Sequence, residues 1–172
     1  MTALIENYVS PNVNKRFAFA AWCLIAIAVC LWFAAIVGAP ILKIYNFDFA
    51  ADSIYTFFSF LCHQQSERSF HLRAHQFAVC ARCAGVYFGL MFGVLVYPLV
   101  RSLDDLQPLP RVLLLLAPVP TTVDFLLGWL GVWENTHLSR FLTATVLGLG
   151  CAFFLVPGVV EIARYFLVSG KR

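Results

Sequence analysis

Long uncharged apolar stretches dominate the pattern of hydrophobic and polar positions along the chain. Two of them, 17–39 and 141–160, contain no charged residue. Each is long enough to cross a hydrocarbon core about 30 Å thick as a helix that rises about 1.5 Å per residue. A third uncharged run, 84–100, lies near the lower limit of length, and a fourth, 112–133, is interrupted only by Asp124. The pattern predicts an all-α, polytopic membrane helix bundle with four transmembrane helices.

Prolines and polar residues predict where these helices begin and end. The first helix is expected over about 17–38, because Pro40 disfavours continuation of a helix. The second begins near Cys80 and runs to about Val100, and the third starts near Arg111.

The last two helices contain prolines of their own. Pro118 and Pro120 are expected to kink the third helix, and Pro157 to kink the fourth, which starts near Leu138.

A polar amino-terminal segment, 1–16, precedes the first apolar run, which could be mistaken for a signal peptide. The run is longer than the roughly 7–15 apolar residues of a signal sequence. Pro40 also stands directly after the small residues that resemble a cleavage site at 37–39. We expect a retained anchor and one integral-membrane domain over 1–172.

A Cys/His-containing connection, 41–83, joins the first two predicted spans. Its part 54–62 is apolar and aromatic but too short to span a bilayer. It is expected to form a short helix, either amphipathic and interfacial or re-entrant, which would carry Cys62 and His63 into the protein.

Composition agrees with a membrane protein, since 61% of the residues are hydrophobic and only 12% are charged. A soluble domain carries about 25% charged residues. The net charge of +3 includes no stripe of lysine and arginine, which argues against a nucleic-acid partner. With the amino terminus inside, seven basic residues lie inside and five outside. That small excess favours an outer position for the cysteines.

Cys80 and Cys83 form a CxxC pair at the start of the second predicted span, 18 residues after Cys62-His63. A helix amino terminus and the neighbouring Arg82 lower the pKa of thiols. Three thiols and one imidazole are the ligand set of a Cys3His zinc site. The pattern predicts a metal site with zinc as the expected ion, although simultaneous ligation by adjacent Cys62 and His63 requires a turn.

Two other interpretations of these cysteines stay open. Cys80 and Cys83 could form a redox disulfide in a quinone-linked membrane thiol oxidoreductase, with Cys62 as a relay thiol, or the thiols could be inert. Cys23, Cys30 and Cys151 lie inside predicted spans and are assigned no role.

His71 and His75 stand four residues apart and would share a face if they lay on a helix. A solvated loop is the favoured interpretation, and the two histidines are reserve ligands.

Small residues recur every fourth position in the second span. Such a row lets another helix approach closely. That helix can belong to the same chain, to a second copy of the chain in a homo-oligomer, or to a membrane-protein partner. The row comprises Ala81, Gly85, Gly89 and Gly93.

Asp124 is expected to be buried and paired, because a carboxylate in lipid is costly. Candidate partners are Arg68, Arg82 and Arg140, which together with Asp124 would form a polar cluster. Asn135 or Thr136 is expected to cap the fourth helix.

Three blocks of sequence resemble the signature of a bacterial integral-membrane family known only as a domain of unknown function. They are Leu61-Cys62-His63-Gln64, then Glu67-Arg68-Ser69-Phe70, and Val79-Cys80-Ala81-Arg82-Cys83-Ala84-Gly85-Val86-Tyr87-Phe88-Gly89. Pro120, Asp124, Glu134, Asn135, Arg140 and Thr143 also follow the family's pattern. The chain departs from that pattern at Phe125, Gly128 and Ala144. The resemblance implies a small multi-pass protein of a bacterial inner membrane, and it implies no reaction.

Three functions fit these observations. The first is an integral membrane protein with a surface metal site whose polar cluster binds an anionic lipid head group or a partner subunit. The second is the quinone-linked thiol oxidoreductase. The third is an accessory subunit of a larger membrane complex.

Overall fold

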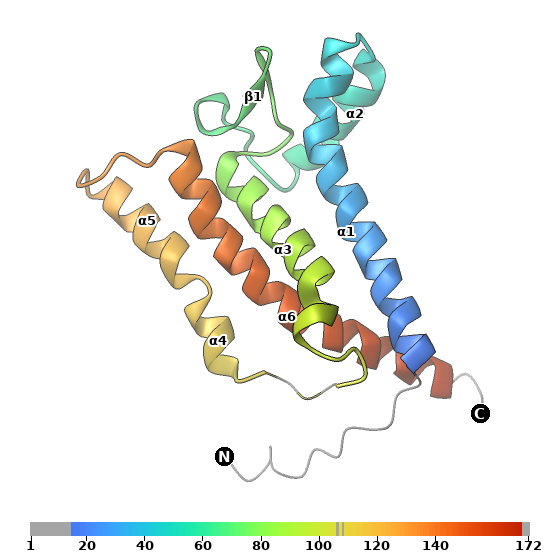
Figure 1. Ribbon diagram of the computed structural model, residues 1–172. Helices are drawn as coiled ribbons and strands as arrows, with labels where there is room; N and C mark the ends of the chain where they lie inside the picture. The colour runs from blue at the N-terminus through green and yellow to red at the C-terminus, as the bar shows by residue number, and fades with distance from the viewer. Residues whose placement is uncertain (1–14, 106, 108, 170–172) are drawn as a thin grey trace.

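The fold is a helix bundle with one very small sheet. A computed structural model of the chain describes residues 15–105, 107 and 109–169. Most of the polar segment expected over 1–16 therefore lies outside the described residues. In chain order the elements are α1 (Lys15–Ile44), α2 (Asp48–Ser59), η2 (Ser66–Arg68), β1 (His71–Leu72), β2 (His75–Gln76), α3 (Ala81–Val100), α4 (Arg111–Leu116), α5 (Val119–Trp129) and α6 (His137–Ser169) (Figure 1).

Four helical segments within the described residues are long and apolar enough to cross a membrane, which confirms the predicted number. They are Lys15–Ile44, Ala81–Val100, Arg111–Trp129 and His137–Tyr165. The largely apolar outer surface of the bundle fits this assignment, because lipid rather than water would surround it.

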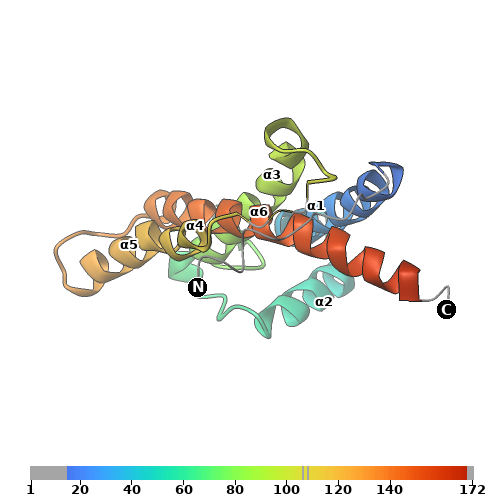
Figure 2. The ribbon, with the colours of Figure 1, turned by 90° about the horizontal axis from the view of Figure 1, so that it is seen from below.

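α6 is the central helix of the arrangement. It packs most extensively against α3, and α4 and α5 lie on one side of it while α1 and α2 lie on the other (Figures 1 and 2). The carboxyl end of α1, the starts of α3 and α6 and the end of α5 all lie at the same end of the bundle (Figure 1). The connection that carries the cysteines covers that end.

Glycines form the seam between α3 and α6. A Cβ added at Gly85 or Gly89 would overlap the backbone carbonyl of Phe141 or Thr145, and one added at Gly148 would overlap that of Val86. Small residues thus let the two backbones come into direct contact. The small-residue row predicted from the sequence serves packing within the chain.

We predict that Gly89→Ala lowers the free energy of unfolding by about 2–3 kcal/mol, because the added methyl group overpacks the seam. Gly38→Ala is the matched control, since a Cβ there meets no atom of the described residues within 4 Å. Thermal unfolding of both variants in mild detergent measures the difference. Equal stability of the two variants would contradict the assignment of the seam.

Pro40 does not end α1, so the expected end near residue 38 is wrong. The helix continues to Ile44 because the proline falls in its last two turns. The hydrogen bond that proline cannot donate is replaced by one from another part of the chain. Proline lacks an N–H, which leaves the carbonyl of Ile36 without its helical donor. The backbone N–H of Ala78 donates to that carbonyl, with an N···O distance of 3.3 Å. Pro40 therefore creates the acceptor that attaches the segment before the CxxC pair to α1.

Pro98 in α3 acts in the same way. Its missing N–H leaves the carbonyl of Val94 free, and the indole N–H of Trp22 in α1 donates to it at 2.8 Å. Two prolines thus provide acceptors for hydrogen bonds that tie α1 to the rest of the chain.

The third predicted span is broken rather than kinked. α4 ends at Leu116 and α5 begins at Val119, around Pro118. The fourth predicted helix starts at His137, as expected near Leu138, and α6 continues without interruption past Pro157.

α2 folds back along the last turns of α1 as a helical hairpin (Figure 1). Because α1 has 30 residues, it is about 45 Å long and extends beyond a hydrocarbon core about 30 Å thick. α2 packs on this end of α1, where it exposes Phe49 and Phe57. The segment therefore delivers Cys62 to the start of α3 as the second arm of a hairpin.

The connection after Cys62 contains a two-stranded antiparallel sheet. His71 pairs with Gln76 and Leu72 with His75, and the turn between the strands places Arg73 and Ala74 at positive φ. The two histidines lie on opposite strands and do not form the helical i, i+4 pair that the spacing allows.

Candidate functional site

Cys62 is held in a buried position directly after α2. Its N–H donates to the carbonyl of Phe58 at 2.9 Å, which continues the helical turn, and its side chain is only 6% exposed. The Gln64 side-chain amide donates to the carbonyls of Tyr55 and Ala78 at 2.7 and 2.9 Å. Gln64 thus binds the end of α2 to the segment that leads into α3.

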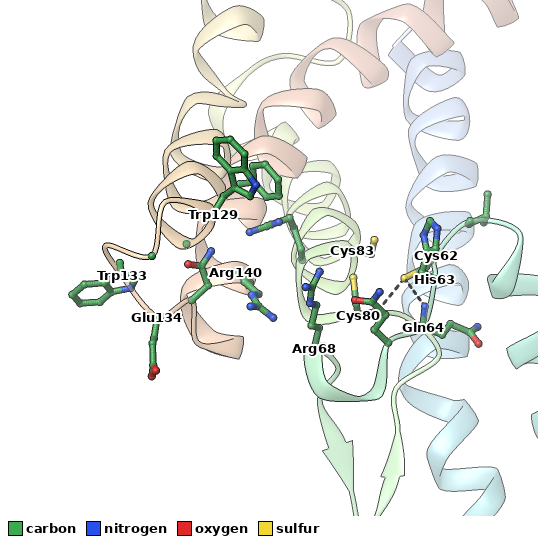
Figure 3. A pocket seen from close by; sticks show the side chains of 17 residues that line it. Cys62, His63, Gln64, Arg68, Cys80, Cys83, Trp129, Trp133, Glu134 and Arg140 are labelled. Atoms are coloured by element: carbon green, nitrogen blue, oxygen red, sulfur yellow. Dashed lines mark hydrogen bonds between the residues drawn. The ribbon is translucent and has the colours of Figure 1, made fainter.

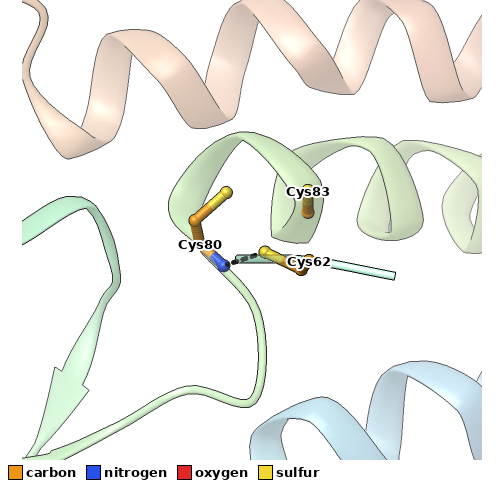
Figure 4. A group of neighbouring side chains, drawn as sticks. All are labelled: Cys62, Cys80 and Cys83. Carbon is orange, nitrogen blue, oxygen red and sulfur yellow. Dashed lines mark hydrogen bonds between the residues drawn. The ribbon is translucent and has the colours of Figure 1, made fainter. Parts of the chain in front are cut away.

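Cys80 and Cys83 lie at the amino terminus of α3. Cys80 is the N-cap residue, with extended backbone angles, and Cys83 follows one turn later. The Cys80 N–H, which has no partner within the helix, donates to the sulfur of Cys62 at 3.2 Å (Figure 4).

The three sulfurs meet at this point. The Sγ atoms of Cys62, Cys80 and Cys83 all lie within 4.8 Å of one another. All six cysteines are free thiols in the structure. Cys23, Cys30 and Cys151 lie outside the group.

Hydrogen bonds favour the thiolate form of Cys62. The thiols of Cys80 and Cys83, followed by the N–H groups of Cys80 and Gln64, lower the pKa of the Cys62 thiol. A thiolate is the form that binds metals and that attacks disulfides. The site therefore supports both chemistries that the CxxC pattern suggests.

His63 does not join the three sulfurs. The structure brings together three of the four predicted ligands, and His63 remains exposed on the wall of an adjoining cavity. Adjacent residues project in different directions, which explains why Cys62 points inward and His63 does not.

The cavity beside the sulfurs has a volume of about 1060 Å³. It lies between the cysteine connection and the ends of α5 and α6 (Figure 3). All three cysteines of the group line it, together with three arginines, two tryptophans and Glu134. The arginines and tryptophans are Arg68, Arg82, Arg140, Trp129 and Trp133.

Asp124 pairs with Arg82, one of its three candidate partners. The two side chains are 2.9 Å apart, and the exposed fractions are 6% for Asp124 and 30% for Arg82. The side-chain amide of Asn135 donates to the Asp124 carboxylate at 3.0 Å and to its carbonyl at 2.7 Å. This network joins α3 to α5 and to the segment before α6, and it confirms the expectation that Asp124 is buried and paired.

Asn135 lines the cavity and binds Asp124, a role that its position before the fourth helix does not predict, because that position indicates only a helix cap. The cap is Thr136, whose hydroxyl accepts the N–H of Ser139 at 3.0 Å. A Cβ at Gly128 would overlap the Asn135 side chain, so the glycine leaves the space that this amide occupies. The sequence contains one signal for this contact. Asn135 is a polar residue directly before a predicted helix, and the preceding helix contains the buried Asp124.

Comparisons with known proteins agree with this architecture. Residues 62–154 match the model of a family described as a predicted membrane protein (DUF2085). An uncharacterized protein of Methanocaldococcus jannaschii, MJ1492, is 35% identical over 109 residues, which cover 63% of this chain and 70% of that protein. An uncharacterized protein of Methanothermobacter thermautotrophicus is 34% identical over 95 residues, or 55% and 84% of the two chains. No solved structure matches.

Both relatives are archaeal, so they do not support the bacterial origin and bacterial inner membrane that the resemblance implied. The matched region covers more than half of the chain. It extends from Cys62, the first residue of the cysteine group, into α6. The chain therefore belongs to the DUF2085 family of predicted membrane proteins.

Proposed function

We propose that Cys62, Cys80 and Cys83 bind one zinc ion as three thiolates, in a centre whose fourth position opens onto the arginine-lined cavity. The convergence of the three sulfurs carries this proposal. Zinc–sulfur bonds of about 2.3 Å in a tetrahedral site place the sulfurs about 3.8 Å apart. The sulfurs here lie within 4.8 Å of one another, so small side-chain rotations bring them into range. Thiolates favour zinc over hard ions such as magnesium.

The number of protein ligands supports an open site. Structural zinc sites are closed by four protein ligands, whereas catalytic sites have three and leave a position for water or substrate. The three sulfurs line the cavity, and His63 lies outside their group. A ligand in the cavity would thus reach a Lewis acid at the membrane surface.

The centre also has a structural consequence. Cys62 follows α2, while Cys80 and Cys83 begin α3. A metal ion bound by all three would clip the end of the α1–α2 hairpin to the amino terminus of a transmembrane helix. Metal binding and correct placement of the connection would therefore be linked.

His63→Ala tests the open position. We expect the variant to keep about one zinc ion per chain and to bind it less than about tenfold more weakly, because His63 supplies no ligand. Cys62→Ala, the matched variant of a neighbouring residue, is expected to lose the metal. Elemental analysis and competition with a chelator measure both effects. Equal loss of zinc from the two variants would instead indicate a closed Cys3His site.

A further inference from the structure

Two arginines in the cavity lack a carboxylate partner among the residues that the structure describes. Arg82 pairs with Asp124, and at the opposite end of the bundle Arg101 pairs with Asp105. No ion pair of this kind involves Arg68 or Arg140 in the described part of the chain.

The three guanidinium groups come from separate elements and converge on one space. Arg68 ends η2, Arg82 is in the first turn of α3, and Arg140 is in the first turn of α6. All three side chains line the cavity beside the sulfurs. Figure 3 shows Arg68 and Arg140 between the cysteines on one side and the tryptophans on the other. A cluster of like charges is costly unless an anion compensates it.

Two other polar side chains on the cavity wall, those of Arg82 and Glu134, leave the charges of Arg68 and Arg140 available to a ligand. The Nε of Arg82 is buried and has no hydrogen-bond partner in the part of the chain that the structure describes, although the same side chain pairs with Asp124 through Nη2. Glu134, a carboxylate on the wall that forms no ion pair with a described residue, is exposed, and its side chain extends away from the arginines (Figure 3).

Part of the cavity wall is apolar and lies at the end of a transmembrane helix. Trp129 is the last residue of the third span and is 75% exposed, Trp133 is 60% exposed, and Leu61 is 50% exposed. Tryptophans at the end of a span are typical of the boundary between lipid and water. A ligand in the cavity can therefore place a charged group on the arginines and an apolar group on this wall.

We propose that the cavity binds the phosphate group of a phosphate ester, with Arg68 and Arg140 as the main contacts and Arg82 as a third. Guanidinium groups form paired, charge-assisted hydrogen bonds with phosphate oxygens. Two guanidinium groups without a carboxylate partner among the described residues match a phosphomonoester, which carries about −1.5 to −2 charges at neutral pH. The ester comes either from a lipid head group or from a soluble compound. The inference does not depend on the metal centre.

Native mass spectrometry of the full chain in detergent tests the proposal with phosphatidic acid and with diacylglycerol of the same acyl chains. These lipids differ only in the phosphate group. We expect one tightly bound phosphatidic acid per chain and at least about tenfold weaker binding of diacylglycerol. Arg68→Gln and Arg140→Gln should each weaken the binding of phosphatidic acid by about tenfold or more.

Arg111→Gln is the matched control, because Arg111 is exposed at the start of α4, away from the cavity. Arg68 is also exposed, so its replacement tests the proposal even if Arg140→Gln disturbs the fold. Equal binding of the two lipids, or equal effects of Arg111→Gln and Arg68→Gln, would overturn the proposal.

Competition with glycerol 3-phosphate distinguishes the two sources of the phosphate. Failure to compete at comparable concentrations identifies a lipid ligand and a role for the apolar wall. Full competition also supports the phosphate site but assigns it to soluble esters. Zinc content is measured in the same samples. Retained zinc in the arginine variants, and retained phosphate binding in metal-free Cys83→Ser, would separate this site from the metal centre.

Discussion

Replacement of Cys83 with serine is expected to reduce the zinc content from about one ion per chain to less than about one tenth. Two thiolates remain in the variant, and a serine hydroxyl is a poor zinc ligand. A ligand present at a thousand times its dissociation constant stabilises the folded state by about 4 kcal/mol. For a chain of this size, its loss lowers the melting temperature by about 8–16 °C. Elemental analysis and thermal unfolding in detergent measure the two effects.

Cys151→Ser is the matched control for this experiment. Cys151 is a partly buried free thiol in α6 and lies outside the cysteine group. The same substitution there is expected to leave the zinc content unchanged and to shift the melting temperature only slightly. A Cys83→Ser protein that kept its zinc, or that was as stable as Cys151→Ser, would show that Cys83 is not a ligand.

Asp124→Asn is expected to lower the free energy of unfolding by about 2–3 kcal/mol. Removal of one partner from a fully buried ion pair costs about 3–5 kcal/mol, because the other charge is left without compensation. The Arg82 side chain is 30% exposed, so water moderates the effect here. Asparagine preserves the size of the side chain, which isolates the loss of charge. Reversible unfolding in mixed detergent micelles gives the free energy.

Asp48→Asn provides the comparison for Asp124→Asn. Asp48 pairs with Lys43, but its side chain is 65% exposed, and Lys43 keeps Asp52 as a second partner. Exposed ion pairs contribute about 0–1 kcal/mol, so the control should change little. A double-mutant cycle of Asp124→Asn with Arg82→Gln should give a coupling energy above about 1 kcal/mol. Equal effects of the two aspartate variants, or no coupling, would contradict the assigned pair.

The transmembrane helices could be predicted because exclusion of charge from a long contiguous stretch is a local property of the sequence. The end of α1 could not, because it depends on a tertiary contact. Pro40 disfavours further helix by local rules, but the N–H of Ala78 uses the freed carbonyl of Ile36.

The small hairpin was missed because its turn lacks the usual signal. Two-residue turns with both φ angles positive normally contain asparagine or glycine. Here Arg73 and Ala74 occupy these positions. The sequence of this segment therefore predicts an irregular polar connection instead of a hairpin.

The candidate site was predictable to the extent that its chemistry is concentrated in short motifs. The CxxC pair and the preceding Cys-His pair indicated the region, and the structure brings three of these four residues together. The partner of Asp124 required the fold, since Arg68, Arg82 and Arg140 were equivalent candidates in the sequence. The convergence of these arginines beside the sulfurs likewise depends on the relative placement of η2, α3 and α6.

Elemental analysis of the purified full chain, combined with counting of reactive thiols before and after chelation, tests the central claim most directly. We predict about one zinc ion per chain, and three thiols that react only after the metal is removed. Those thiols should map to Cys62, Cys80 and Cys83. Metal-free protein with a disulfide between Cys80 and Cys83, or with three freely reactive thiols at these positions, would contradict the metal centre.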